Sequence, residues 1–180
     1  PSLTERAGVS NRAGADCYVS LHSNAAGNDG WYDASGLEIY TSQGPMTARR
    51  NVLAADLAEA FRAAGVSLRS SPIKHQLYTV LVKTDAPACL IEYGFHTSRE
   101  EVALLKDSAY RERLAGATAK GICSFLGVAW KEAAPVSELD GAVDKLAAAG
   151  LINSPDYWKA GDYSAENVQA LLVKWAASLD

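Results

Sequence analysis

Two short apolar runs, each leading into polar residues, constrain the fold more than any other feature of this sequence. Cys17-Tyr18-Val19 precedes Ser20-Leu21-His22-Ser23-Asn24, and Ala88-Cys89-Leu90-Ile91 precedes Glu92. Segments with helical periodicity lie between and after these runs, which predicts strands that alternate with helices. This alternation is typical of a mainly parallel sheet covered by helices on both faces. We therefore expect a three-layer α/β domain.

Local signals predict the other elements of this domain. Helices are expected over residues 2–13, 47–64 and 109–126, with a further short helix capped by Ser98. Strands are expected over residues 15–21, 37–40 and 87–93, and strand-like structure over 77–81. Exposed loops are expected over residues 26–31 and 67–73, because both segments contain turn-forming residues.

Composition argues against several classes of function. The net charge is −4 and there is no run of Lys or Arg, so nothing points to nucleic acid or an anionic membrane surface. No apolar stretch approaches the roughly 20 residues that a membrane-spanning helix needs. The sequence has no Gly-x-Ser-x-Gly motif and no glycine-rich phosphate loop. Cys89 lies within an apolar run, which favours a small buried side chain over a nucleophile.

A histidine and a carboxylate close the two apolar strands. Side chains at the carboxyl end of a strand project into an open crevice in α/β proteins, so His22 and Glu92 are candidates for a metal ligand and a general base. Ser20 and Asn24 alternate with His22 and are expected on its face, where they orient it or bind substrate. A structural histidine and a salt bridge at the sheet edge are the simpler alternatives.

Several separated segments resemble one family in the same order. They are Arg6, Asn11-Arg12, Ala15-Asp16, Ser20-Leu21-His22-Ser23-Asn24-Ala25, Gly36-Leu37-Glu38-Ile39-Tyr40 and Leu90-Ile91-Glu92-Tyr93-Gly94-Phe95. Over about residues 1–127 the chain resembles the zinc-dependent N-acetylmuramoyl-L-alanine amidases of bacterial autolysins and phage endolysins. The resemblance implies cleavage of the amide bond between N-acetylmuramic acid and L-alanine of peptidoglycan by zinc-activated water. It also implies action in the cell wall, outside the membrane, by a protein that in phages is made in the cytoplasm and then released.

The resemblance also implies roles for particular residues. His22 would be a ligand of Zn²⁺ and Glu92 the catalytic acid and base. From their positions in the sequence, Ser20, Asn24 and His96 are candidates for contact with substrate, and His96 is also a candidate for approach to the metal. His75, in an expected loop, is a further candidate for substrate contact. Glu38 lies in the middle of an expected strand, which favours a structural role.

Two ligands of the family's zinc site have no counterpart in the expected place. Family members supply them from an upstream Gly-His-Gly motif and a later Glu, whereas this sequence begins at Pro1. We expect the chain to be part of a longer amidase. The alternative is a non-catalytic remnant that binds the cell wall or regulates another protein. A peptidase that cuts within the stem peptide is a third possibility.

A change in composition divides the chain near residue 131. Residues 1–130 form the expected catalytic domain, residues 131–136 a linker, and residues 137–180 a small unit of two or three helices in which Ser137 resembles a capping residue. That last unit is near the lower size limit for independent folding. A packing appendage and a module that binds the cell wall or a partner are both compatible with its sequence.

Overall fold

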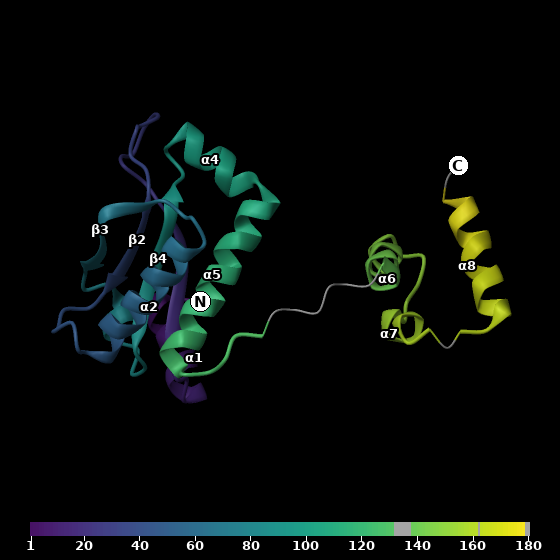
Figure 1. The fold of residues 1–180 in the computed structure, drawn as a ribbon, viewed down its shortest axis with the longest axis horizontal. Coiled ribbons are helices and arrows are strands. Elements are labelled where there is room, and N and C mark those ends of the chain that lie inside the picture. The colour runs from purple at the N-terminus through teal and green to yellow at the C-terminus, as the bar shows by residue number, and fades with distance from the viewer. Residues whose placement is uncertain (132–137, 162, 179–180) are drawn as a thin grey trace. The chain divides into compact units, whose positions relative to one another are not determined.

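The computed structural model describes residues 1–131, 138–161 and 163–178, which fall into two compact units, Pro1–Trp130 and Lys131–Asp180 (Figure 1). The first unit is a mixed α/β domain and the second is helical, which confirms the expected fold class. Most of the expected linker, residues 132–136, lies outside the described residues, as does Ser137.

Four strands form the central sheet of the first unit. They are β1 (Tyr18–Asn24), β2 (Leu37–Thr41), β3 (Leu68–His75) and β4 (Ala88–Phe95), and their order across the sheet is β1-β4-β2-β3. β1 pairs with β4 and β2 pairs with β3 in parallel, whereas β2 and β4 are antiparallel. The sheet is therefore mainly parallel, as expected, with one antiparallel pairing at its centre.

The main core lies between one face of this sheet and the helices α2 (Arg49–Ala63) and α5 (Ser108–Leu126) (Figure 1). Both helices bury an apolar stripe, with Leu53, Leu57 and Phe61 of α2 fully shielded from solvent. The short helix α4 (Arg99–Lys106) leads into α5. Ser98 precedes α4 and caps its N-terminus by accepting a hydrogen bond from the Glu101 amide. That cap confirms the expected helix start.

Gly121 lets α5 approach α2 closely, and its replacement should destabilise the first unit. A Cβ atom at this position would lie 2.8 Å from the Leu57 Cα atom, so the two helix backbones would have to separate. We expect Gly121→Ala to lower the free energy of unfolding by about 1–2 kcal/mol. Gly116→Ala, in the same helix but with no heavy atom within 4 Å of its Cβ position, should instead raise it by about 0.5–1 kcal/mol. Urea denaturation of both variants checks this, and equal effects would contradict the packing argument.

Helices α1 (Leu3–Ala13) and α3 (Thr79–Val82) lie on the opposite side of the sheet from α2 and α5. Val80 and Leu81 are buried against Ala88 and Leu90 of β4. Asn11 of α1 connects this helix to the residues that follow α3. Its side chain donates to the Lys83 carbonyl at 3.0 Å and accepts from the Asp85 amide at 3.0 Å. The sheet therefore has helices on both faces.

Two expectations for this unit were wrong. Residues 67–73 were expected to form a loop, but β3 begins at Leu68, and its Pro72 is tolerated because β3 is an edge strand. Residues 77–81 were expected to be strand-like, but they contain the single-turn helix α3. One turn is too short for helical periodicity to show in a sequence.

The second unit consists of α6 (Glu138–Ala148), α7 (Pro155–Lys159) and α8 (Ala165–Ala177). Among its described residues, Val143 and Ile152 are the buried apolar ones, and Lys159 forms an ion pair with Asp144 at 2.7 Å. Pro155 occupies the first turn of α7, and Ser164 caps α8 by accepting from the Asn167 amide. Among all the described helices, none combines the length and the apolar composition needed to cross a membrane.

Candidate active site

The alternation of side chains along the strands places a set of polar residues on the sheet face that carries α3. Cys89 and Ile91 of β4 point into the main core, whereas Ala88 and Leu90 pack against α3. Because side chains two positions apart share a face, Glu92 lies on the α3 face as well. Leu37 and Ile39 of β2 are in the main core, so Glu38 points the same way as Glu92.

The strand register brings three of these polar residues into one row. His22 of β1 is paired with Glu92 of β4, and Glu92 is paired with Glu38 of β2. Neighbouring strands are about 4.8 Å apart, so each side chain lies beside the next. The two residues that close the apolar strands of the sequence are therefore direct neighbours in the sheet.

A pocket of about 430 Å³ opens over part of this row. Its lining includes Leu3, Arg6, Ser20, His22, Leu77, Tyr78, Thr79, Val80, Leu90 and Glu92. The Ser20 hydroxyl lies 3.0 Å from Nε2 of His22, the geometry of a hydrogen bond that orients the imidazole. The lining of the pocket thus combines apolar side chains with an imidazole and a carboxylate, a composition typical of small-molecule and active sites.

Glu92 is held in a state that binds a proton readily. Its Oε2 atom is buried and has no hydrogen-bond partner among the described residues. Burial, assisted by the negative charge of Glu38, raises the pKa of Glu92 to about 7. A carboxylate with this proton affinity can both accept and release a proton near neutral pH.

Glu38 is a buried carboxylate with several hydrogen-bond and ion-pair partners, and these partners were not predicted from the sequence. Its side chain is only 3% exposed. Its Oε1 atom accepts from Arg69 Nε at 2.9 Å and from Lys74, and its Oε2 atom accepts from Asn24 at 2.9 Å and from the Tyr40 hydroxyl at 2.8 Å. Burial would raise the pKa of Glu38, but the hydrogen bonds from Lys74 and Tyr40 and the charges of Lys74 and Arg69 lower it. Glu38 therefore stays ionised beside Glu92.

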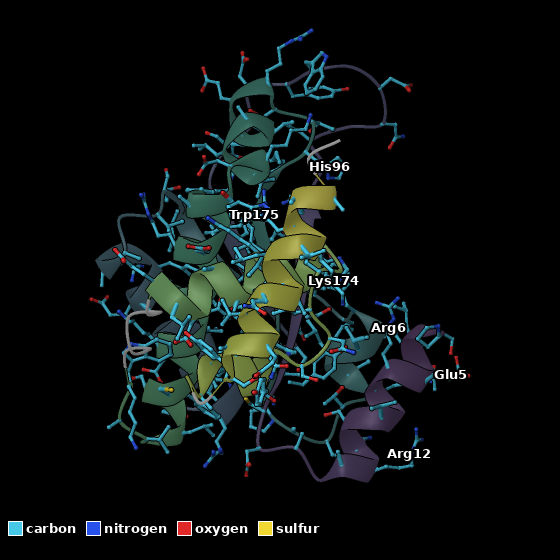
Figure 2. The ribbon with its side chains drawn as sticks, turned by 90° about the vertical axis from the view of Figure 1, so that its right-hand side faces the viewer. Glu5, Arg6, Arg12, His96, Lys174 and Trp175 are labelled. Carbon is cyan, nitrogen blue, oxygen red and sulfur yellow. The ribbon has the colours of Figure 1, made fainter. Side chains whose placement is uncertain are left out.

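The other candidate residues do not line the pocket. Asn24 donates to Glu38. The exposed His96 has its Nδ1 atom 3.1 Å from the Ser23 hydroxyl, and Figure 2 shows it well separated from Arg6, which lines the pocket. His75 ends β3, and its Nδ1 atom lies 2.9 Å from the Thr41 hydroxyl. The structure brings His22, Ser20 and Glu92 together at the pocket. Asn24 does not line the pocket but reaches the same row through its hydrogen bond to Glu38, whereas His96 and His75 do not line the pocket.

The described residues do not supply a complete zinc site. A structural or catalytic zinc ion takes at least three protein ligands. Within residues 1–131, 138–161 and 163–178, no three His, Cys, Asp or Glu side chains are grouped closely enough to hold a metal ion. Of the described residues that line the pocket, His22 alone carries an imidazole, and the burial of Cys89, which raises the pKa of its thiol, argues against a thiolate as a further ligand.

Comparison with known proteins places this geometry in a family context. The chain is 31% identical over 134 residues to the N-acetylmuramoyl-L-alanine amidase CwlM of Bacillus licheniformis, covering 74% of this chain and 49% of the relative. It is 30% identical over 131 residues to an endolysin of Bacillus phage SPP1, covering 70% and 46%. The crystal structure of an N-acetylmuramoyl-L-alanine amidase from Clostridium difficile 630 matches with a TM-score of 0.63 and 28% identity, covering 71% of this chain and 66% of that one.

The matched region coincides with the α/β unit. The chain spans about half the length of the curated relatives named above. The family model described as N-acetylmuramoyl-L-alanine amidase (Amidase_3) matches residues 1–124, which include all four strands and the pocket. On this evidence the chain belongs to the Amidase_3 family of N-acetylmuramoyl-L-alanine amidases.

Proposed function

We propose that this protein cleaves the amide bond between N-acetylmuramic acid and the L-alanine of the stem peptide in peptidoglycan. The observation that carries the proposal is the pairing of His22 with Glu92 in the lining of one pocket, where a buried oxygen of Glu92 has no hydrogen-bond partner among the described residues. Family membership supports the reaction class. The substrate would be the bacterial cell wall, so the protein would act outside the membrane.

Glu92 would move the protons in this reaction. An amide is a poor electrophile with a poor leaving group, so the attacking water must lose a proton and the departing amine must gain one. Glu92 would accept the first proton and return it to the nitrogen of L-alanine. Its raised pKa suits both steps, because a group that titrates near the working pH is an effective acid and an effective base.

We further propose that His22 is one ligand of a zinc ion. When bound, zinc lowers the pKa of water and polarises the carbonyl. Ser20 would fix the ring of His22 for this role through its contact with Nε2 or, once that atom is occupied, would bind substrate. The remaining zinc ligands would be residues that are not grouped with His22 in the described part of the chain.

One observation favours a second function. No three metal-ligating side chains are grouped within the described residues, and a single imidazole would hold zinc weakly. A chain of this kind acts instead as a non-catalytic module that binds the cell wall or regulates another protein. The helical second unit, as a wall-binding module or as a packing appendage, is compatible with either function.

Product analysis separates these possibilities. Purified peptidoglycan is incubated with the protein, and the newly exposed amino groups are identified by labelling and hydrolysis. An amidase exposes the amino group of L-alanine, whereas a stem-peptide peptidase exposes the amino group of another residue. A wall-binding protein exposes none but sediments with the polymer. We expect L-alanine, and its absence would overturn the proposed reaction.

Removal of the imidazole should weaken zinc binding. We expect His22→Ala to reduce the affinity for zinc at least tenfold, because the substitution removes one of the side chains that would bind the ion directly. His96→Ala is the matched control, since that ring contacts Ser23 and does not line the pocket. Competition with a chromogenic chelator measures both. Equal zinc affinity in the two variants would exclude His22 as a ligand.

A further inference from the structure

The connection between β1 and β2 exposes two aromatic side chains. Residues 25–36 contain no helix or strand, and they carry Trp31, which is 51% exposed, and Tyr32, which is 39% exposed. Two adjacent exposed aromatic rings offer apolar surface that a ligand can cover. Neither residue belongs to the pocket that contains Glu92.

Hydrogen bonds hold this connection in one arrangement. The Tyr32 amide donates to the Thr97 carbonyl at 2.8 Å, and the Ala26 amide donates to the Thr97 hydroxyl at 3.0 Å. The Arg99 guanidinium lies over the Trp31 ring, 4.5 Å from its centroid. A cation stacked on one face orients the indole. The aromatic surface is therefore formed before any ligand arrives.

The rings belong to a pocket with mixed chemistry. This pocket has a volume of about 380 Å³ and is lined by Trp31, Tyr32, Asp33, Ser98, Arg99 and Glu100. Its aromatic faces suit the C–H groups of a ligand, and its carboxylates and hydroxyl groups accept hydrogen bonds from O–H and N–H donors. The two carboxylates outnumber the one guanidinium, so the pocket disfavours anionic ligands such as the carboxylates of a stem peptide.

We propose that this pocket binds a neutral N-acetylhexosamine ring of the peptidoglycan glycan strand. Such a ring presents C–H groups on one face and hydroxyl and amide donors around its edge, which matches the lining. The inference rests on the proposed function, which supplies a polymer of these sugars. Thr97 follows Glu92 by five positions, at most about 17 Å of extended chain. The segment that contributes Ser98, Arg99 and Glu100 to the pocket therefore begins close enough to Glu92 for one polymer to contact both.

Binding of tetra-N-acetylchitotetraose tests the proposal. This probe contains neutral N-acetylhexosamine rings and has no stem peptide, so its binding needs no hydrolysis. We expect calorimetry to show binding by the natural chain and an affinity at least tenfold lower for Trp31→Ala. Trp31→Phe should retain most of the affinity, since an aromatic face remains. Trp130→Ala is the matched control, because Trp130 is also exposed and also lies near a cation, Lys120, but is outside the pocket.

Three results would overturn the proposal. They are no binding of the tetramer by the natural chain, equal affinity in Trp31→Ala and Trp130→Ala, and tighter Trp31-dependent binding of a peptide with free carboxylates than of the tetramer. Measuring both tetramer binding and amide hydrolysis on the natural chain separates this inference from the proposed function. If Trp31-dependent binding of the tetramer persists while the natural chain releases no L-alanine amino groups, the sugar pocket stands and the proposed reaction fails.

Discussion

Glu92→Gln should lower the rate of amide hydrolysis by about 10²–10⁴-fold, the usual contribution of a positioned general acid and base. Glutamine has nearly the same shape but cannot take a proton from water or deliver one to the departing amine. The buried Oε2 atom of Glu92 accepts no hydrogen bond from the described residues. Replacing the carboxylate by an amide therefore breaks no such bond at that atom. We therefore expect the loss to fall on the rate, with the folded structure kept.

The measurement is the release of L-alanine amino groups from peptidoglycan, with thermal unfolding recorded in parallel. Glu112→Gln serves as the control, because Glu112 is an exposed carboxylate on α5, on the other side of the sheet. The control should retain full activity. If Glu92→Gln kept more than a tenth of the natural rate, another group would have to move the proton, and the role assigned to Glu92 would be wrong.

The sequence predicted the elements that have local signals. Helix α1 was predicted over residues 2–13, and its ends depend on local contacts, since Ser2 and Glu5 form a capping box and Gly14 follows in the left-handed conformation. Strand β3 was missed because Ser70-Ser71-Pro72 has the composition of a turn. At the edge of a sheet, pairing with β2 overrides that local preference, and only the tertiary structure reveals this.

The candidate site shows the same division between local and long-range information. His22 and Glu92 were predicted because each follows an apolar run, and the parallel register of β1 and β4 makes them neighbours. Their catalytic and ligand roles remain predictions, as do the substrate contacts expected of Ser20, Asn24 and His96. The many contacts of Glu38 were missed because Arg69 lies in the segment that was expected to be a loop. One signal for these contacts was present in the sequence, because Glu38 lies between the apolar residues Leu37 and Ile39. A charge that is buried in such a strand needs partners.

Glu38→Gln should lower the free energy of unfolding at pH 7 by about 2–3 kcal/mol, because it leaves Arg69 and Lys74 without their shared anion. The loss is smaller than for a fully buried pair, since the Arg69 and Lys74 side chains are 38% and 39% exposed and can turn toward water. Glu59→Gln is the matched control. Glu59 pairs with Arg62 on the surface, where both side chains are more than half exposed, so the expected change is below about 1 kcal/mol.

The effect of Glu38 should also depend on pH in one direction. Its pKa in the folded protein lies below the ordinary value of 4.5, so the unfolded chain takes up a proton first as the solution is acidified. The stabilisation is therefore complete above about pH 5 and disappears as the pH falls below 4.5 toward the pKa of the folded state. Urea denaturation of the natural chain and Glu38→Gln between pH 7 and pH 3 should show two stabilities that converge at the acid end. If the difference in unfolding free energy between the two proteins stayed constant over this pH range, Glu38 would stabilise the fold by its packing and not by its charge. The charge of Glu38 would then not explain the raised pKa of Glu92.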